Sequence, residues 1–385
     1  MREFFTGNEA AAWAARLARA QYIPCYPITP QTEIIETLAQ WLADGLMDAD
    51  FCSMDSEHSV LSAAIGASAA GARVFTATSS QGLELMHEML YIASGLRLPI
   101  VMANCSRGLS APITLLPDHN DYLSVRDTGW IMMNAQNNQE VLDSMVMAFK
   151  ISEDKNVLLP SLVNLDGFIL SYTMEPTIVP EQSMVDKFLP PYRPTHAFFD
   201  PERPMVQGVA VLNPDDYTYF RKQLHKAQLN AKEVIERVCG EWKKLTGRHY
   251  GLVEEFMMEG ADMALVIQGS ISTTAKEAVK DMRKKGTKIG LLRIRVFRPF
   301  PKQEIAKSLS KLDGVAVVDK NLAPGLGGIA HPEIKECLYD AKERPIVSSF
   351  VAGLGGKPES VKQFAEITDA LKKDIKDKRG RIRFV

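Results

Sequence analysis

Residues 73–104, RVFTATSSQGLELMHEMLYIASGLRLPIVMAN, decide the fold class of this chain. Residues 73–80 predict a buried strand, residues 81–95 predict a helix, and residues 98–104 predict a second strand. A strand, a helix and a second strand in this order form a crossover unit in which the two strands run parallel. The stretch therefore predicts an α/β fold built on a parallel sheet.

The same alternation continues on both sides of this unit. YIPCY (residues 22–26), DFCSM (residues 50–54) and VLLPSLVNL (residues 157–165) are predicted strands, and helices lie between them. Asn8 is predicted to cap the first helix. Short apolar strands that alternate with helices indicate a doubly wound sheet with helices on both faces.

A second alternating block begins near Asp262 and predicts a smaller α/β domain. Its predicted strands are MALVIQGS, KIGLLRIRVF, GVAVVD and RPIVSSFVAG (residues 263–270, 288–297, 314–319 and 344–353). The basic tail LKKDIKDKRGRIRFV, residues 371–385, is interpreted either as a solvated face or as a docking segment for another subunit.

Prolines are dense between Glu175 and Pro214, and so long an irregular stretch is unusual inside a compact domain. We expect this proline-rich arm to wrap over the surface or over another subunit. A long helix is predicted from Pro214, with Asn213 before it and Gly247 closing it. The predicted division of the chain is residues 1–174, residues 175–255 (the arm and the connecting helix) and residues 256–385.

Composition excludes several classes of function. The chain has 385 residues, more than one hydrophobic core usually holds, so two domains are expected. Its formal net charge of −2 gives no global electrostatic field that would attract nucleic acid or an acidic membrane. No apolar run approaches the roughly 20 residues that span a bilayer, and no signal peptide is recognisable. Five cysteines lie singly, which predicts no local zinc or iron–sulfur motif and fits a reducing cytoplasm: Cys25, Cys52, Cys105, Cys239 and Cys337.

Polar residues follow four predicted strands of the first block, at the strand ends where parallel α/β sheets bind their ligands. These segments are residues 26–30, 55–58, 79–82 and 106–112. If they share one edge of the sheet, that edge holds the carboxylate of Glu57, the guanidinium of Arg107 and several hydroxyls. A polar cluster in a largely apolar mouth is typical of a ligand site.

Each of these residues also has a purely structural interpretation. Glu57 in the first turn of a helix favours the helix dipole, and Arg107 can pair with a nearby aspartate. DHND (residues 118–121) resembles a metal site and equally suits a loop anchor, so no metal site is predicted. In YPITP (residues 26–30) two prolines fix φ and hold Thr29 in a rigid extended corner.

Three long segments occur in an order that resembles a known family. They are GNEAAAWAARLARAQYIPCYPITPQTEIIETLAQW (residues 7–41), SMDSEHSVLSAAIGASAAGARVFTATSSQGLELMHEMLYIASGLRLPIVMAN (residues 53–104) and RGLSAPITLLPDHNDYLSVRDTGWI (residues 107–131). Together they closely resemble the alpha subunit of the pyruvate:ferredoxin oxidoreductase family, the 2-oxoacid:ferredoxin oxidoreductases. The resemblance implies a doubly wound, transketolase-type thiamine pyrimidine-binding domain, followed by a smaller transketolase C-terminal-like α/β domain.

The resemblance implies a reversible reaction of anaerobic metabolism. A 2-oxoacid, coenzyme A and oxidised ferredoxin give an acyl-CoA, CO2 and reduced ferredoxin, with thiamine diphosphate as the cofactor. Pyruvate is the favoured 2-oxoacid, which makes the chain a subunit of pyruvate synthase. The alternatives are a branched-chain 2-oxoacid or oxalate oxidoreductase, a non-catalytic scaffold subunit and an independent transketolase-like enzyme.

The resemblance also implies roles for individual residues. Glu57 matches the family glutamate that hydrogen-bonds N1′ of the cofactor's aminopyrimidine. Arg107 matches the arginine that binds the substrate carboxylate, and Thr29 matches the threonine that hydrogen-bonds the substrate's oxygens. Thr29, Ser80 and Gln81 are also expected to contact the cofactor.

The chain lacks the Gly-Asp-Gly motif with which the family holds Mg²⁺ and the diphosphate. The resemblance therefore implies a beta subunit that shares the thiamine diphosphate site and carries Mg²⁺ and a [4Fe–4S] cluster. It also implies gamma and ferredoxin-like delta subunits, and ferredoxin as the electron partner. The complete complex is expected to be a dimer of these heteromers and to lie in the cytoplasm. No nucleic acid and no membrane is expected to bind, and the chain is predicted to be inactive by itself.

Overall fold

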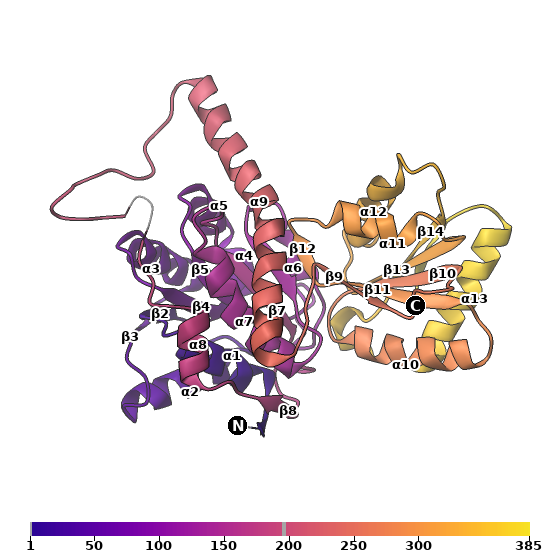
Figure 1. Cartoon of the computed structure of the whole chain (residues 1–385), viewed down its shortest axis with the longest axis horizontal. Helices are drawn as coiled ribbons and strands as arrows, with labels where there is room; N and C mark the ends of the chain where they lie inside the picture. The colour runs from indigo at the N-terminus through magenta and orange to yellow at the C-terminus, as the bar shows by residue number, and fades with distance from the viewer. Residues whose placement is uncertain (1, 195–197) are drawn as a thin grey trace.

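The computed structural model describes residues 2–194 and 198–385, and it contains two α/β blocks that lie side by side (Figure 1). A seven-stranded sheet with its helices forms the N-terminal block, and a six-stranded sheet with its helices forms the C-terminal block. The prediction of two α/β blocks on mainly parallel sheets is confirmed. Among the described residues no helix is long and apolar enough to cross a bilayer.

The seven-stranded sheet has the order β12-β6-β7-β5-β4-β2-β3. Six of these strands run parallel, and β12 pairs antiparallel with β6. The strands are β2 (Tyr22–Cys25), β3 (Asp50–Ser53), β4 (Val74–Thr78), β5 (Ile100–Ser106), β6 (Ile131–Asn134), β7 (Ser161–Asp166) and β12 (Val296–Arg298).

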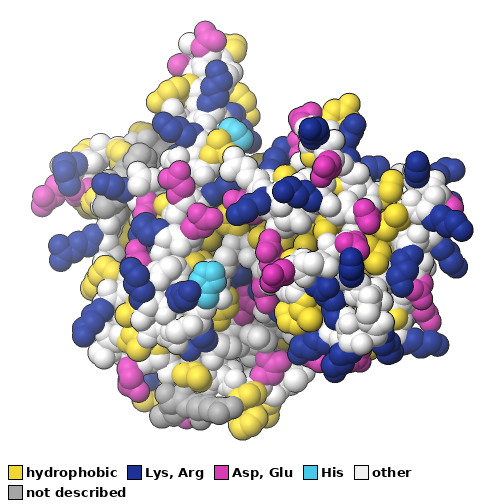
Figure 2. Space-filling view, turned by 45° about the vertical axis from the view of Figure 1, so that its right-hand side comes forward, with side chains coloured by type: hydrophobic (Ala, Val, Ile, Leu, Met, Phe, Trp, Pro, Cys, Tyr) yellow, Lys and Arg dark blue, Asp and Glu magenta, His cyan; other side chains and the backbone are white. Residues whose placement is uncertain are grey.

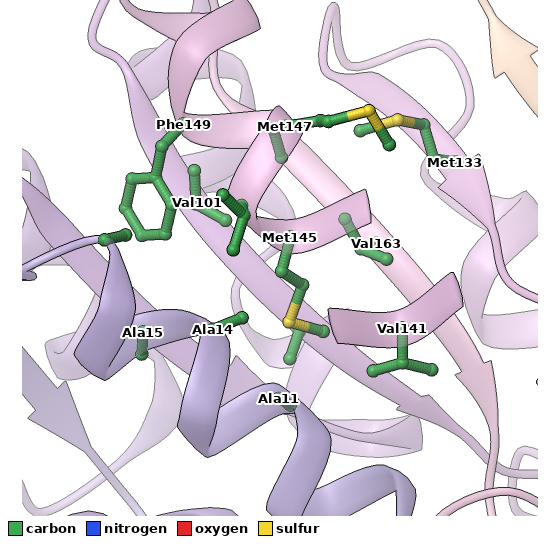
Figure 3. Packing of buried hydrophobic residues seen from close by; sticks show 14 of the residues in the cluster. Ala11, Ala14, Ala15, Val101, Met133, Val141, Met145, Met147, Phe149 and Val163 are labelled. Carbon is green, nitrogen blue, oxygen red and sulfur yellow. The ribbon is translucent and has the colours of Figure 1, made fainter. Parts of the chain in front are cut away.

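Helices cover both faces of this sheet, as the alternation predicted. Val101 and Ala103 of β5 point into the core that α1, α2 and α7 share, and Figure 3 shows alanines of α1 among the methionine and valine side chains of this core. Ile100 and Met102 point to the opposite face, against α3, α4 and α5. The helices are α1 (Gly7–Leu17), α2 (Thr32–Ala43), α3 (Glu57–Ala69), α4 (Ser80–Leu85), α5 (His87–Gly95), α6 (Asn120–Ser124) and α7 (Asn138–Ser152).

The C-terminal sheet has the order β15-β14-β13-β10-β11-β9, and its strands run parallel except for β9. Its strands are β9 (Val253–Phe256), β10 (Met263–Ile267), β11 (Ile289–Ile294), β13 (Gly314–Asp319), β14 (Ile346–Val351) and β15 (Ile382–Phe384). Its helices are α10 (Ile271–Lys284), α11 (Lys302–Leu309), α12 (Ala330–Leu338) and α13 (Val361–Lys376).

The segment between the two blocks contains the predicted long helix. α9 (Pro214–Thr246) is capped by the side chain of Asn213 and ends at Gly247 in the left-handed conformation, so this prediction is confirmed. Its first turns stand clear of the molecule, whereas its later turns pack into the N-terminal core (Figure 1). The remaining elements are β1 (Arg2–Phe5), β8 (Glu175–Ile178), which pairs with β1, α8 (Gln182–Phe188) and a short 3-10 helix, η1 (Leu354–Gly356). The division after residues 174 and 255 stays a prediction.

The prediction of one strand over residues 288–297 is wrong, because the chain leaves the C-terminal sheet after Ile294 and joins the N-terminal sheet as β12. Arg293 and Arg295 at this crossing are buried, and both pair with Glu140 of α7, at 3.1 and 2.7 Å. Because an unpaired charge in such a position is costly, these ion pairs fix where the chain crosses between the sheets.

Thr6, and not Asn8, caps the first helix. The Thr6 hydroxyl accepts from the backbone N–H of Glu9 at 3.1 Å, and the Glu9 carboxylate accepts from the backbone N–H of Thr6 at 2.8 Å. This reciprocal capping box has the pattern Thr-x-x-Glu, which is visible in the sequence. Asn8 is buried instead and donates to the carbonyl of Pro30 at 2.8 Å, so it ties α1 to the proline corner.

The basic tail belongs to the C-terminal sheet, because β15 pairs with β14. Arg381 and Arg383 bind the buried carboxylate of Asp374 in α13, each at 2.5 Å. Burial raises the pKa of Asp374, but Arg383, Ser348 and Arg381 outweigh this effect and lower the pKa to about 2. These two arginines therefore have internal partners. Figure 2 shows basic side chains at the edge of the C-terminal block, with acidic side chains among them.

Candidate active site

The four polar segments predicted from the sequence lie at one edge of the N-terminal sheet, which we call the rim. β3, β2, β4 and β5 are neighbours in the sheet and run parallel, so their carboxyl ends open on the same side. The rim consists of residues 26–30, 55–58, 79–82 and 106–112. The arrangement of strands thus brings Glu57, Arg107 and Thr29 to a common edge.

Glu57 begins α3 at the rim, where Ser56 caps the helix by accepting from the backbone N–H of Ser59 at 3.3 Å. Glu57 is only 6% exposed, yet its carboxylate has no hydrogen-bond or ion-pair partner within the described parts of the chain. A Cβ on Gly82 would lie 2.6 Å from Glu57 Oε1 and 2.6 Å from Thr78 Oγ1, so glycine leaves room for the carboxylate. A helix N-terminus favours this charge but does not explain why it is buried without a partner.

Arg107 follows β5 and is held by two neutral oxygens. Its Nη1 donates to the carbonyl of Thr29 at 2.6 Å, and its Nη2 donates to Oε1 of Gln81 at 2.8 Å. Burial lowers the pKa of Arg107, while the charges of Asp121 and Glu57 act in the opposite direction. No carboxylate in the described residues forms an ion pair with this guanidinium, so the structural interpretation as an Arg–Asp pair does not account for it.

Thr29 contacts Arg107 through its backbone carbonyl. Its side chain is exposed at the rim, and its hydroxyl makes no hydrogen bond to the described chain. The proline corner around it is fixed from two sides, because Gln31 Nε2 donates to the carbonyl of Tyr26 and Asn8 donates to that of Pro30, each at 2.8 Å. The corner therefore fixes an acceptor for Arg107, and it leaves the hydroxyl free toward the rim.

Ser80 and Gln81 connect the loop after β4 with the loop after β5. Ser80 is buried at a φ of 48°, and its hydroxyl lies within hydrogen-bond distance of Gly108 O (2.9 Å) and Gln81 Oε1 (2.7 Å). Gln81 Oε1 thus accepts from Arg107 and is one of two acceptors within reach of the Ser80 hydroxyl. The structure therefore brings all five predicted site residues, which are Thr29, Glu57, Ser80, Gln81 and Arg107, to the rim.

Asp121 is a buried anchor of this site, in the DHND segment for which the sequence left a metal site and a loop anchor equally open. Its Oδ2 accepts from the backbone N–H of Ser80 at 2.9 Å and from that of Arg107 at 3.2 Å, and its Oδ1 accepts from the hydroxyl of Ser106 at 2.7 Å. Burial raises the pKa of Asp121 to about 6, and the donors of Ser106, Ser80 and Arg107 limit that rise. At neutral pH the carboxylate is therefore ionised and holds two rim loops together.

The DHND segment serves as a loop anchor. Asp118 accepts from the backbone N–H of Asn120 at 3.0 Å, and Asp121 binds the donors described above. Within the described residues no group of three histidine, cysteine or acidic side chains is placed to hold a metal ion. The only sequence signal for Asp121 was this segment, whose partners lie on two other loops.

Several buried polar atoms at the rim and at the adjoining end of β4 have no hydrogen-bond partner among the described residues. More than nine in ten buried polar groups are satisfied in native proteins, so a cluster of exceptions is a feature to which a polar ligand would fit. The hydroxyls and N–H groups can donate, and the Glu57 carboxylate beside them can accept, which fits a polar heterocycle such as an aminopyrimidine. The unpaired atoms are Thr78 Oγ1, Ser79 Oγ, Gln81 Nε2 and Arg107 Nε.

Comparison with protein families gives two consecutive matches. Residues 13–239 match the family described as pyruvate flavodoxin/ferredoxin oxidoreductase, thiamine diphosphate-binding. Residues 261–364 match the pyruvate:ferredoxin oxidoreductase core domain II. The first match contains every rim residue described above.

Similar proteins of known name match over nearly the whole chain. Pyruvate synthase subunit PorA of Methanothermobacter thermautotrophicus is 47% identical over 94% of this chain and 93% of its own. PorA of Pyrococcus furiosus is 44% identical, with 98% and 95% covered. Ketoisovalerate oxidoreductase subunit VorA of Pyrococcus horikoshii is also 44% identical, with 97% and 95% covered.

Solved structures share the fold at low sequence identity. The 2-oxoglutarate:ferredoxin oxidoreductase of Magnetococcus marinus aligns with a TM-score of 0.75 at 19% identity, covering 97% of this chain and 65% of that one. A split-gene transketolase aligns with a TM-score of 0.55 at 13% identity, covering 98% of this chain and 100% of that one. Both support a transketolase-type arrangement of the two α/β blocks.

Asp121→Asn should loosen the rim, because an NH₂ group in place of Oδ2 would face the backbone N–H groups of Ser80 and Arg107, which have no other acceptor among the described residues. We expect a cost of about 1–3 kcal/mol at this anchor. Hydrogen–deuterium exchange should therefore accelerate at the amides of Ser80 and Arg107. Asp127→Asn, which changes an exposed side chain, is the matched control. Unchanged exchange at both amides would contradict the anchoring role.

Proposed function

The chain belongs to the pyruvate:ferredoxin oxidoreductase family, and we propose that it is the alpha subunit of a pyruvate synthase. This enzyme interconverts a 2-oxoacid, coenzyme A and oxidised ferredoxin with an acyl-CoA, CO2 and reduced ferredoxin. The observation that carries the proposal is the rim itself, where Glu57, a buried residue whose carboxylate has no partner, and Arg107, whose guanidinium forms no ion pair, face a common edge. The 47% identity to a pyruvate synthase subunit supports pyruvate as the substrate.

Glu57 is proposed to act on the cofactor. Thiamine diphosphate, when bound, supplies the carbon nucleophile for the 2-oxoacid and takes up the electron pair that is left when CO2 departs. The Glu57 carboxylate would hold a proton at N1′ of the aminopyrimidine, a role for which a buried, unpaired acceptor is suited. Thr78 lies next to the same glycine, Gly82, as Glu57, and Thr78, Ser79, Ser80 and Gln81 would orient the same ring.

Arg107 is proposed to bind the carboxylate of the 2-oxoacid. A guanidinium can donate to both oxygens of a carboxylate, and two neutral acceptors position this one without cancelling its charge. Its Nε is buried and unpaired, which leaves a donor for the substrate. Thr29 would add a hydrogen bond from its exposed hydroxyl to the substrate's oxygens.

The rest of the site is proposed to lie on partner subunits. The chain has no Gly-Asp-Gly motif, and its five cysteines are free and scattered, so Mg²⁺ and the [4Fe–4S] clusters are assigned to other chains. A beta subunit would complete the thiamine diphosphate site, and gamma and ferredoxin-like delta subunits would pass electrons to ferredoxin. We assign this complex, a dimer of heteromers, to the cytoplasm, as free buried thiols favour.

A branched-chain 2-oxoacid is the second candidate substrate, because the VorA relative has 44% identity to this chain. The PorA and VorA relatives both match this chain over nearly its whole length. The rim residues therefore do not distinguish pyruvate from a branched-chain 2-oxoacid. An oxalate enzyme would need extra positive charge near the proline corner, where Thr29 is neutral. A scaffold subunit would have no use for a buried carboxylate without a partner, so the rim disfavours that alternative.

Glu57→Gln should abolish proton exchange at C2 of the thiazolium in the assembled holoenzyme. We expect turnover to fall by about 10²- to 10⁴-fold, the usual contribution of one acid–base group. The exchange is measured by NMR after an acid quench, with thiamine diphosphate content checked in parallel. Glu88→Gln is the control, since that side chain is 79% exposed on α5. C2 exchange at the unmodified rate would refute the role of Glu57.

Arg107→Ala should raise the KM for the 2-oxoacid by at least about tenfold, because one charged hydrogen bond to the substrate is lost. The KM for coenzyme A should stay the same. Viologen reduction by the assembled complex measures both constants. Arg203→Ala on the exposed arm is the control. An unchanged KM for the 2-oxoacid would mean that Arg107 has only a structural role.

Purification of the native complex tests the assignment as a whole. Iron–sulfur subunits should co-purify with the chain, and the complex should reduce ferredoxin with pyruvate and coenzyme A faster than with 2-oxoisovalerate, oxalate or 2-oxoglutarate. A preference for 2-oxoisovalerate would select the branched-chain alternative. Absence of any iron–sulfur partner would count against membership of an electron-transferring complex.

A further inference from the structure

The loop that carries Arg107 is held at its far end by the C-terminal block. The backbone N–H of His119 donates to the carbonyl of Lys320 at 2.7 Å. The backbone N–H of Leu322 donates to Oδ1 of Asn120 at 2.8 Å. A third contact, from the backbone N–H of Gly356 to the carbonyl of Pro117 at 2.8 Å, lies beside these two. The loop therefore begins on β5 of one block and ends against the other.

A buried carboxylate lies at the centre of this contact. Asp166 ends β7 and stands opposite Ser106, the residue before Arg107, in the paired register of β5 and β7. Its Oδ1 lies 2.5 Å from Nε2 of His119. Its Oδ2 accepts from the backbone N–H of Ser270 at 3.1 Å and from the Ser270 hydroxyl, and it lies 3.5 Å from Nζ of Lys320.

The charges in this cluster are isolated from water. The side chains of Asp166, His119 and Lys320 are each no more than 1% exposed. Burial alone would raise the pKa of Asp166, but Lys320 and His119 outweigh it and hold the pKa well below its usual range. A buried ion pair of this kind adds little net stability, yet removal of one partner is costly, so it enforces one arrangement of the groups that meet there.

Gly269 lets the two blocks approach closely at this point. It follows β10 with a φ of +72°, a conformation that favours glycine. A Cβ on this residue would lie 2.8 Å from Cε1 of His119 and 3.2 Å from Oδ2 of Asp166. The end of β10 is therefore shaped to receive the histidine of the Arg107 loop.

We propose that Lys320 and Ser270 of the C-terminal block are positioning residues for Arg107, acting through Asp166 and His119. The inference rests on the proposed role of Arg107 as the ligand of the substrate carboxylate. Asp121 fixes the start of the loop to the N-terminal block, and the Asp166 cluster fixes its end to the C-terminal block. The C-terminal block thus sets the affinity for the 2-oxoacid, although none of its residues belongs to the rim.

Lys320→Met in the assembled complex is the principal test, because it removes the buried positive charge and keeps the length of the side chain. Amide hydrogen–deuterium exchange in the peptide that covers residues 107–118 should accelerate by about tenfold, as expected when a local anchor is lost. The KM for the 2-oxoacid should rise roughly three- to tenfold while kcat stays within about twofold, as expected for lost positioning of a binding group.

Ser270→Ala is the milder second variant, for use if Lys320→Met fails to assemble. It removes one donor to Asp166 and keeps the backbone N–H that also binds there. Its effects on loop exchange and on KM should have the same direction and a smaller size.

Glu333→Gln is the matched control, because Glu333 pairs with Arg298 at 2.7 Å and this ion pair also joins the two blocks. It lies away from the loop, so exchange of residues 107–118 and the KM should not change. Loop exchange that is unaltered in both Lys320→Met and Ser270→Ala would overturn the proposal. Faster hydrogen–deuterium exchange of the loop with an unchanged KM would also overturn the proposal. In that case the loop is anchored by the C-terminal block, but Arg107 does not bind the substrate carboxylate.

Discussion

The buried carboxylate of Asp121 is the interaction on which the candidate site depends. Two loops from neighbouring strands must come together at the rim, and each leaves a backbone N–H that faces inward. One ionised acceptor satisfies both, which is stronger than two separate neutral hydrogen bonds. Ser80, Gln81 and Arg107 occupy their places because this acceptor fixes the backbone from which they project. Asp166, at the end of the neighbouring strand β7, has a similar role. It joins the loop that carries Arg107 to the C-terminal block.

The sequence predicted those features that depend on local periodicity. The strand–helix–strand unit at residues 73–104 was sufficient to predict a parallel sheet. The rule that ligands bind at the carboxyl ends of parallel strands was sufficient to predict which four segments form the rim. The crossing of β12 could not be predicted in this way. Arg293 and Arg295 lie in an apolar, strand-like run, and their partner Glu140 is more than 150 positions earlier in the chain. The sequence left a loop anchor and a metal site equally open for the segment of Asp121, and it could not show which groups Asp121 binds, because two of its donors lie on other loops.

The geometry of the rim explains why such a chain needs partners. Several of its polar side chains are buried at one edge of a sheet, and some of their atoms have no hydrogen-bond partner within the described residues. The loop after Arg107 carries exposed apolar side chains, with Ile113 at 74% exposure and Leu115 and Leu116 also uncovered. Apolar groups around an unsatisfied polar cluster are typical of a surface that another chain covers. The proposed beta subunit would bury these groups and supply the diphosphate half of the site.

The way in which Arg107 is held matters as much as its presence. If Asp121 paired with the guanidinium, the two charges would cancel and little attraction would remain for a substrate carboxylate. Instead, Asp121 binds the backbone N–H of Arg107, and the guanidinium rests on the carbonyl of Thr29 and the amide oxygen of Gln81. Neutral acceptors orient the guanidinium without forming an ion pair with it, so its N–H groups can still pair with a charged ligand. The proline corner contributes to this arrangement through the fixed carbonyl of Thr29, since a rigid acceptor holds the guanidinium at little cost in entropy.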